Sequence, residues 1–394
     1  MREVVIVDAI RTPLGRRGGV LSKNHPVETS ALLLKALAER NHMDPEIVDD
    51  VIYGCVSEVG AQSTNLARNV VLTAGWPYTI PGVTLDRQCS SSQQAVHFAA
   101  NQIGSGAHDV VVAGGTEFMS QIPLGANVGQ NMGVPFTKAM QDQYDLSSQG
   151  IAAERIAEKW GIDRAEADEF AVESQMKAAK AAQEGRFKSE MIPVPGKKKV
   201  KKDDGSEEWL DATIDFDEGI RPGTTVEGLA ALKPSFKEDG VHHAGNSSQI
   251  TDGSAAVLLT HPDKAREMGW RPRARIVSQA VVGSDPALML TGPITATPLA
   301  LQRAGLTMRD IDLVEINEAF ASVVLSWKRE MNADMSKVNV NGGAIALGHP
   351  TGCTGARLFG TLLNELERTG GKYGLVTMCV GGGIGTATVI ERLD

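Results

Sequence analysis

Short runs of β-branched and other apolar residues recur along the chain, and helical patterns separate them. The runs are continuous rather than alternating, which is typical of strands buried on both faces of a sheet. They lie at Val4–Val7, Val51–Tyr53, Val110–Ala113, Ala274–Val277, Leu313–Ile316 and Leu375–Cys379. Helical spacing of apolar residues is found at Thr29–Arg40, Gln93–Ile103, Thr297–Ala304 and Ala356–Glu367. The pattern predicts an α/β fold with largely parallel, buried sheets.

The order of runs and helices is similar in the two ends of the chain. The run that begins at Val51 is followed 38 positions later by Cys89, then by a helix and a run that ends in glycines. The run that begins at Leu313 is followed 38 positions later by Thr351, then again by a helix and a glycine-ended run. This repeat predicts two related halves with reactive turns at similar places.

The middle of the chain lacks the alternation of apolar runs and helices found at its two ends. Helical patterns at Ser148–Trp160 and Arg164–Glu184 are joined there by stretches rich in glycine and proline. We therefore expect residues 1–116 to begin an N-terminal half, 117–258 to hold an inserted loop domain with the end of that half, and 259–394 to form a C-terminal half. The five lysines of Lys197–Lys202 are followed at once by acids, which favours a solvated hairpin tip over a phosphate site.

Composition narrows the class of protein. A net charge of −9 argues against general affinity for nucleic acid or for anionic membranes. Four cysteines in 394 residues do not make a disulfide framework, so a reducing compartment is expected. We find no signal peptide, no apolar stretch of membrane-spanning length and no peroxisomal address. We expect a cytoplasmic protein with no nucleic-acid or membrane partner.

Three residues in glycine- or serine-rich turns are candidates for chemistry: Cys89, His349 and Cys379. A cysteine nucleophile needs a base nearby, and an acyl intermediate needs backbone N–H donors around its oxygen, which glycines leave approachable. A helix that begins near Ser90, together with His349, is expected to favour the Cys89 thiolate. The three residues predict an enzyme that forms an acyl-thioester on cysteine.

The remaining cysteines and histidines have plainer interpretations. Cys55 and Cys353 are expected to be buried and structural. The pair His242-His243 is expected in a loop near a site entrance, since no further ligand lies at metal-binding spacing. No Cys-x-x-Cys is present to support zinc at the three candidate residues, so no metal is expected.

Four stretches, spread over essentially the whole chain, resemble the thiolase family, which cleaves or forms 3-ketoacyl-CoA. They are Asp86–Gln94, Asn317–Phe320, Asn341–Arg357 and Cys379–Gly385. The resemblance implies two halves, each with a mixed five-stranded sheet and helices, plus an inserted loop domain. It also implies an acyl-CoA substrate, coenzyme A as cosubstrate, no bound cofactor, and a homodimer or homotetramer.

The resemblance also carries roles for single residues. It makes Cys89 the nucleophile, His349 its activator and Cys379 the acid that protonates the leaving acetyl-CoA enolate. Asn317 holds a water beside His349, and the N–H groups of Cys89 and Gly381 face the acyl oxygen. The positions that match CoA-binding and tunnel residues of the family are Arg221, Phe236, Ala244, Ser248, Ala319 and Phe320.

The residues 314–327 and 349–355 look like those of actinobacterial thiolases of steroid breakdown. The resemblance therefore implies a degradative enzyme that acts on steroid-derived or other bulky acyl-CoA. Ser92, Ser148-Gln149 and Gly228 depart from the common family pattern, and the changed covering loop is compatible with a bulkier acyl group. A biosynthetic acetoacetyl-CoA thiolase and an inactive acyl-CoA-binding homologue stay open as alternatives.

Overall fold

The strands of the protein form one large mixed sheet and one separate hairpin. The computed structural model describes residues 2–128 and 133–394. The path of the large sheet is β10-β11-β12-β9-β1-β8-β5-β3-β4, and β2 pairs with β8 at its side. The strands are β1 (Val5–Arg11), β2 (Gly15–Arg16), β3 (Asp50–Gly54), β4 (Val83–Leu85), β5 (Val110–Phe118), β8 (Thr251–Thr260), β9 (Ala274–Gly283), β10 (Leu313–Ile316), β11 (Tyr373–Val380) and β12 (Ile384–Arg392).

The path divides into two halves of the same design. In the first half β3 runs parallel to β5, and β8 and β1 follow in antiparallel order. In the second half β10 runs parallel to β11, and β12 and β9 follow in antiparallel order. Only two residue pairs, Val5–Arg275 and Ile6–Ala274, join β1 to β9. Where β4 lies beside β3, the second half has a single parallel bridge, Val314–Val338.

The α/β fold with two duplicated halves is therefore present, but the expected dominance of parallel strands is wrong. Two of the missed strands, β8 and β12, run antiparallel to their neighbours. Both contain many small and hydroxyl-bearing residues, as in Thr251-Asp252-Gly253-Ser254, so they lack the continuous branched apolar run that marks the other strands.

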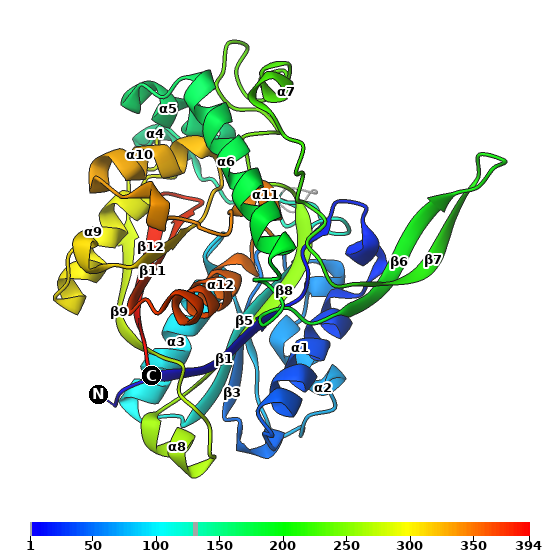
Figure 1. Cartoon of the computed structure of the whole chain (residues 1–394), viewed down its shortest axis with the longest axis vertical. Helices are drawn as coiled ribbons and strands as arrows, with labels where there is room; N and C mark the ends of the chain where they lie inside the picture. The colour runs from blue at the N-terminus through cyan, green and yellow to red at the C-terminus, as the bar shows by residue number, and fades with distance from the viewer. Residues whose placement is uncertain (1, 129–132) are drawn as a thin grey trace.

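Helices cover both outer faces of the halves and fill the space between them (Figure 1). The central pair, α3 (Ser91–Ser105) and α12 (Thr354–Thr369), contact each other and strands of the first half, and α12 also contacts β10 and β11. On the outer faces, α1 (Pro26–Arg40) and α2 (Leu66–Thr73) pack on the first half, while α9 (Gly292–Ala304) and α10 (Ala321–Met331) pack on the second. Both central helices begin just after a candidate reactive turn.

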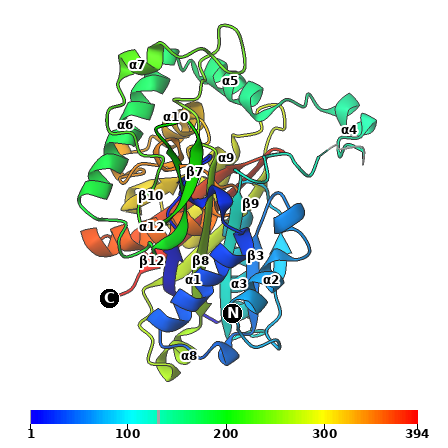
Figure 2. The same ribbon diagram turned by 90° about the vertical axis from the view of Figure 1, so that its right-hand side faces the viewer.

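The segment between the halves forms a helical cap and a projecting arm. The cap contains α5 (Gln149–Trp160), α6 (Arg164–Gln183) and α7 (Val226–Ala230), and α4 (Lys138–Gln143) stands away from it on an extended stretch (Figure 2). The arm is the hairpin of β6 (Val194–Lys201) and β7 (Glu207–Ile214), which extends from the body in Figure 1. The remaining helices are α8 (Pro262–Glu267) and α11 (Ala344–Leu347).

The lysine run lies on this arm, and the hairpin interpretation is confirmed. Lys197 pairs with Asp211 at 3.2 Å and Lys202 pairs with Glu208 at 2.9 Å, so acids on the facing strand balance the lysines. Within residues 2–128 and 133–394, no helix has the length and apolar character needed to cross a membrane.

Candidate active site

A tight turn presents Cys89 at the start of α3. Gln88 adopts the left-handed conformation with φ of 49°, and its N–H donates to the Asp86 carboxylate at 2.6 Å. The Ser91 hydroxyl donates to the Gln88 carbonyl at 2.6 Å and accepts from the Arg87 N–H at 2.9 Å. These bonds stop the chain from continuing as a strand and bring Cys89 to the positive end of a 15-residue helix.

The Cys89 thiol is buried, with 5% of the residue exposed. Burial raises its pKa to about 11, although hydrogen bonds from the N–H groups of Gly381 and of Cys89 itself act in the opposite direction. The helix start and His349 were expected to favour the thiolate, and burial of the thiol acts against any such help. The thiol form predominates near neutral pH because the cost of burying a negative charge exceeds the help from the two amides.

Cys379 and Gly381 come from the hairpin between β11 and β12. Burial raises the pKa of the Cys379 thiol, and the neighbouring Cys89 adds to this effect, so the two sulfurs interact. Gly381 lies in the turn, where a Cβ atom would come within 3.3 Å of the side chains of Gln88 and Gln149. The hairpin therefore brings a second thiol and a backbone N–H to the nucleophile turn.

His349 is held by hydrogen bonds that define its tautomer. The Thr354 hydroxyl donates to the Pro350 carbonyl at 2.9 Å, so it must accept from Nδ1–H of His349, which lies 2.6 Å away. The other ring nitrogen, Nε2, then has a free electron pair, and it lies 3.3 Å from Nδ2 of Asn317. Burial lowers the pKa of His349 to about 3, with a further contribution from Arg357. The imidazole is neutral, and Nε2 can take a proton.

Asn317 follows β10 and completes this side of the site. Its side chain is fully buried, and its Nδ2 group also lowers the pKa of Cys379 by hydrogen bonding. Its Oδ1 atom has no hydrogen-bond partner among the residues that the structure describes. A buried, unpaired amide oxygen is costly, so this atom is suited to a donor from a bound water or substrate.

A buried carboxylate, which the sequence analysis did not single out, fixes the His349 turn to the first half. Glu117 accepts from the Thr351 hydroxyl at 3.1 Å and from the Gly352 N–H at 3.0 Å. On the other side it accepts from the N–H groups of Val56 at 2.9 Å and Ser57 at 3.1 Å, and from Gln62 Nε2 at 2.9 Å. An acid two positions after the glycines that end the apolar run of β5 was the available sequence signal.

Glu318 is a second buried side chain that links several segments by hydrogen bonds, here inside the second half. Its carboxylate accepts from the Ser174 hydroxyl at 2.7 Å, from Asn339 Nδ2 at 2.8 Å and from the Ile345 N–H at 3.1 Å. Ile345 belongs to the segment that leads to His349. The residue after Asn317 therefore connects β10 to both α6 and the histidine turn.

Only some of the residues expected to bind CoA contact one another. Phe236 and Phe320 make an edge-to-face contact with ring centroids 5.7 Å apart, and the Ser248 N–H donates to the Ala319 carbonyl at 2.9 Å. Arg221 is linked to this group through Gln249, whose Oε1 lies 3.5 Å from the guanidinium. Ala244 is exposed in the loop before Ser248. Ala319 and Phe320 follow Asn317 closely in the chain, so the contacts of Phe236 and Ser248 lie next to the segment that holds Asn317.

The two histidines His242 and His243 lie in a loop, as expected, and both are buried there. His243 Nε2 lies 2.7 Å from Asp168 Oδ1, and His242 Nε2 lies 2.8 Å from the Ser322 hydroxyl. Cys55 and Cys353 are buried free cysteines, as expected. In the described part of the chain, no group of three or more histidine, cysteine or acidic side chains is arranged to hold a metal ion.

A cavity of about 1050 Å³ opens beside the nucleophile turn. Gln88, Gln149 and Gly381 line it at the end nearest Cys89. The apolar residues of its wall are Leu124, Val128, Val134, Phe136, Leu146 and Met289. The departing residues Ser148 and Gln149 thus belong to this wall, next to the amide of Gly381.

Comparison with known proteins gives the same family over both halves. Residues 4–263 match the family described as "Thiolase, N-terminal domain", and residues 270–392 match "Thiolase, C-terminal domain". The chain is 47% identical to a steroid 3-ketoacyl-CoA thiolase of Mycobacterium tuberculosis, over 100% of the chain and 95% of that protein. It is 44% identical to a 3-ketoacyl-CoA thiolase of Bacillus subtilis, over 99% of the chain and 100% of that protein.

Two solved structures are similar along their whole length. An acetyl-CoA acetyltransferase of Bacillus anthracis superposes with a TM-score of 0.89 at 40% identity, and human mitochondrial 3-ketoacyl-CoA thiolase with 0.88 at 38%. Each alignment covers 100% of this chain and 99% of the other.

Proposed function

Because the chain belongs to the thiolase family, we propose that it is a degradative 3-ketoacyl-CoA thiolase. It cleaves a 3-ketoacyl-CoA with coenzyme A to acetyl-CoA and a shortened acyl-CoA, through an acyl-Cys89 intermediate. The observation that carries the proposal is the meeting of two thiols, Cys89 and Cys379, with the Gly381 N–H and with a neutral histidine joined to Asn317. An acyl-transfer enzyme needs this set: a nucleophile, a base, a second acid and an oxyanion donor.

The first half-reaction breaks the C2–C3 bond. His349 Nε2 takes the proton of Cys89, and the thiolate attacks the 3-keto carbon. The electrons of the C2–C3 bond then pass to the CoA thioester as an enolate, while the acyl group stays on Cys89. Cys379 gives its proton to C2 of the enolate, and acetyl-CoA leaves.

The second half-reaction transfers the acyl group. The Cys379 thiolate takes the proton of incoming coenzyme A, whose sulfur attacks the acyl-Cys89 thioester. Cys89 leaves as a thiolate and regains its proton from His349. The raised pKa of Cys89 favours this return to the thiol, which restores the resting site.

Each anionic oxygen has its own donors. The N–H groups of Cys89 and Gly381, which already reach the Cys89 sulfur, serve the oxygen of the attacked keto group and of the acyl-enzyme. His349, once protonated, and a water on Asn317 serve the oxygen of the CoA thioester. Coenzyme A is the cosubstrate, and the reaction as written requires no bound cofactor.

Coenzyme A enters along the side lined by Phe236, Phe320, Ala319 and Ser248, with Arg221 and Ala244 farther out. The Phe236–Phe320 contact and the backbone bond of Ser248 to Ala319 give this route one preformed wall. The acyl group lies on the opposite side of Cys89, in the cavity beside Gln88 and Gln149.

The cavity supports a bulky acyl group as substrate. Its volume of about 1050 Å³ is at the upper end of small-molecule sites, which span about 300–1,000 Å³. A straight short chain would leave most of this apolar wall without contacts. Steroid-derived acyl-CoA is one such bulky class, and the name of the mycobacterial relative supports it.

We also infer a homodimer or homotetramer in the cytoplasm. The edge strand β4 pairs only with β3 among the described residues, and Val83 on it is 44% exposed, which supports pairing with another chain. The division into residues 1–116, an inserted loop domain with the end of the N-terminal half over 117–258, and 259–394 completes the proposal; most of β8 lies at the end of the middle part.

The test is CoA-dependent thiolysis across a panel of 3-ketoacyl-CoA esters, from acetoacetyl-CoA through medium chains to a steroid side-chain ester. Cys89→Ala is assayed in parallel, and mass spectrometry locates the acyl group. Turnover that favours the bulky esters and disappears in the variant is the expected result. A preference for acetoacetyl-CoA would favour the biosynthetic alternative, and no turnover with no acyl-enzyme would favour an inactive acyl-CoA-binding protein.

A further inference from the structure

The two thiols of the site belong to different halves and are 290 positions apart in the sequence. Cys89 precedes α3, whereas Cys379 and Gly381 lie on the hairpin of β11 and β12. The proposed chemistry needs these groups in fixed contact, so something must fix α3 against that hairpin. Five buried polar side chains lie between the two elements: Ser90, Gln93 and His97 on α3, and Thr386 and Thr388 on β12. We call this set the bridging network.

The bridging network is a continuous chain of short hydrogen bonds. The hydroxyl oxygens of Ser90 and Thr386 lie 2.6 Å apart, and Thr386 donates to Gln93 Oε1 at 2.7 Å. Gln93 Nε2 donates to the Thr388 hydroxyl at 2.8 Å and to the Val376 carbonyl of β11 at 3.2 Å. His97 Nε2 lies 2.7 Å from the same Thr388 hydroxyl.

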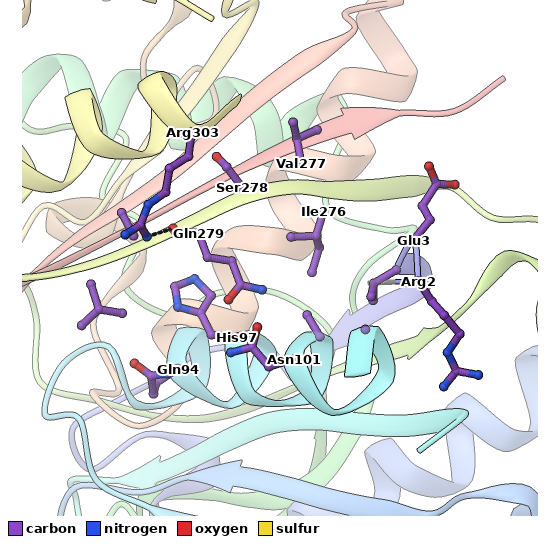
Figure 3. Close-up of a pocket in the computed structure, with 15 residues that line it drawn as sticks. Arg2, Glu3, Gln94, His97, Asn101, Ile276, Val277, Ser278, Gln279 and Arg303 are labelled. Carbon is purple, nitrogen blue, oxygen red and sulfur yellow. Dashed lines mark hydrogen bonds between the residues drawn. The ribbon is translucent and has the colours of Figure 1, made fainter. Parts of the chain in front are cut away.

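The spacing of these residues matches one helix face to one strand face. Positions 90, 93 and 97 follow the helical period, and 386 and 388 are two apart on a strand. Figure 3 shows His97 projecting from α3 toward β9, the strand that pairs with β12. None of the five residues is more than 1% exposed. The network therefore runs from the residue next to Cys89 to the middle of α3 without contact with solvent.

Glutamine is the residue type that this position requires. Oε1 accepts from Thr386, and both hydrogens of Nε2 are used, one for Thr388 and one for Val376. A glutamate could not donate to Thr388, and a leucine could do neither. The Val376 carbonyl, which can only accept, fixes which end of the amide faces β11 and so leaves Oε1 toward Thr386.

An apolar contact would be the simpler way to join these elements. Ala95, Val96, Val376 and Met378 around the network already form a continuous apolar core. Apolar packing tolerates small shifts of one element along another, whereas hydrogen bonds between two elements form in one register only. Ser90, Gln93, Thr386 and Thr388 have all their buried polar side-chain atoms paired, and only Nδ1 of His97 lacks a partner among the described residues. A polar network in such a layer is therefore suited to fixing register rather than to adding stability.

We propose that Gln93 is a positioning residue that sets the register of the Cys89 turn against the Cys379–Gly381 hairpin. The inference rests on the proposed function, because it assigns Gln93 a part in bringing Cys89 and the Gly381 N–H together. Gln93 touches no reacting atom. It acts through Ser90 and Thr386, and its loss moves the Gly381 N–H away from the Cys89 sulfur.

The first variant is Gln93→Leu. We expect kcat for thiolysis to fall about 10- to 100-fold with KM nearly unchanged, because a small displacement of reacting groups costs this much. The second readout needs no turnover: the rate at which iodoacetamide alkylates Cys89 at fixed pH, followed by mass spectrometry. This rate falls as well, since the Gly381 N–H no longer stabilises the thiolate.

Because Gln93→Leu leaves hydroxyls unpaired, it also destabilises the fold, and a second variant separates the two effects. The triple substitution Ser90→Ala, Gln93→Leu, Thr386→Val removes the side-chain partners of position 93 except Thr388, which keeps His97, and leaves the Val376 carbonyl without its bond from Gln93. Replacing all partners with apolar groups of similar shape restores much of the stability. We expect the melting temperature to recover in the triple variant while kcat and the alkylation rate stay low.

Thr297→Val is the matched control, because it removes the buried 3.0 Å hydrogen bond from Trp327 within the second half only. It should lower the melting temperature and leave kcat and alkylation near wild type. Recovery of kcat and alkylation in the triple variant would overturn the proposal, as would the same loss in Thr297→Val. A wild-type protein without thiolysis would refute the proposed function, while the alkylation series would still decide the role of Gln93.

Discussion

The two halves of the chain share one plan, yet they hold different chemistry at equivalent positions. Val51 of β3 pairs with Val112 of β5, and Leu313 of β10 pairs with Gly374 of β11, so the parallel partner lies 61 positions ahead in both halves. A shift of 262 positions carries the first pair onto the second. The same shift carries Cys89 onto Thr351, in agreement with the spacing of 38 residues visible in the sequence.

The shift also relates the residues at the strand ends. Glu117 at the end of β5 corresponds to Cys379 of β11, and Cys55 after β3 corresponds to Asn317 after β10. Glu117 and Cys55 touch each other, as Cys379 and Asn317 do. In the first half the strand ends hold a positioning carboxylate and an inert thiol. In the second half they hold the proposed acid and an amide whose oxygen lacks a partner among the described residues. The comparison shows that the two halves have equivalent positions at their strand ends and turns. The residues proposed to react are distributed over both halves, and each equivalent position carries a different residue in the two.

The largest expected difference is between the two cysteines that precede the central helices. Cys89 precedes α3, and Cys353 precedes α12. Cys89→Ala should reduce thiolysis on the order of 10⁴-fold or more, because the nucleophile is lost. Cys353→Ala should keep near wild-type kcat with a modest loss of stability. Steady-state kinetics of both variants check this, and equal losses would contradict the division of roles.

The next effect tests Glu117, the counterpart of Cys379. Glu117→Gln places an NH₂ group among five donors, so the His349 turn loses part of its attachment to the first half. We expect about 1–3 kcal/mol less stability and a clear fall in kcat. Thermal unfolding and kinetics measure the two.

Asp49→Asn serves as the control for that substitution. Asp49 accepts from the N–H groups of Asp109 and Val110 at the opposite end of β5, far from the histidine turn. It should lower the melting temperature without a matching loss of kcat. An unchanged kcat in Glu117→Gln would show that the His349 turn keeps its place without the carboxylate.

A smaller effect concerns pH. Since burial raises the pKa of Cys89 to about 11, the thiolate fraction rises with pH across the whole neutral and mildly alkaline range. The rate of alkylation of Cys89 by iodoacetamide should therefore increase about tenfold per pH unit from pH 7 to pH 10. A short cysteine peptide under the same conditions levels off above its pKa of about 8.5. A plateau for Cys89 near pH 9 would contradict the effect of burial.

The smallest effect belongs to Thr351, the counterpart of Cys89. Thr351→Val removes one hydrogen bond to Glu117, which keeps four others. Stability should fall by about 1 kcal/mol, and kcat should fall less than in Glu117→Gln. Chemical denaturation and kinetics measure this, and a loss as large as that of Cys89→Ala would remove the contrast between the two turns.

Much of the fold could be predicted from the sequence because buried strands and amphipathic helices leave strong patterns. The runs at Val51–Tyr53 and Leu375–Cys379 fall within β3 and β11, and Gln93–Ile103 falls within α3. The strands β8 and β12 were missed because alanine, glycine, serine and threonine fill tight space between other strands there. Such residues carry little hydrophobic signal even when they are completely buried.

The candidate site could be predicted in part, for similar reasons. Cys89, His349 and Cys379 lie in glycine-rich turns that are distinctive in the sequence alone. Glu117 and Gln93 are not distinctive, because their importance comes from partners more than 200 positions away, such as Gly352 and Thr386. The raised pKa of Cys89 could not be predicted either, since the degree of burial of a thiol depends on the folded surroundings.

The protonated state of resting Cys89 has a consequence for how the protein ages. Because burial raises the pKa of Cys89 to about 11, the thiol form predominates near neutral pH. Peroxide and other oxidants react with thiolates, so we expect Cys89 of the substrate-free protein to react slowly with them. Damage by sulfenic acid formation is then confined to moments when catalysis itself draws the proton away. Preparations stored without substrate, at neutral pH and in air, should keep their titratable Cys89 far longer than an ordinary exposed cysteine would.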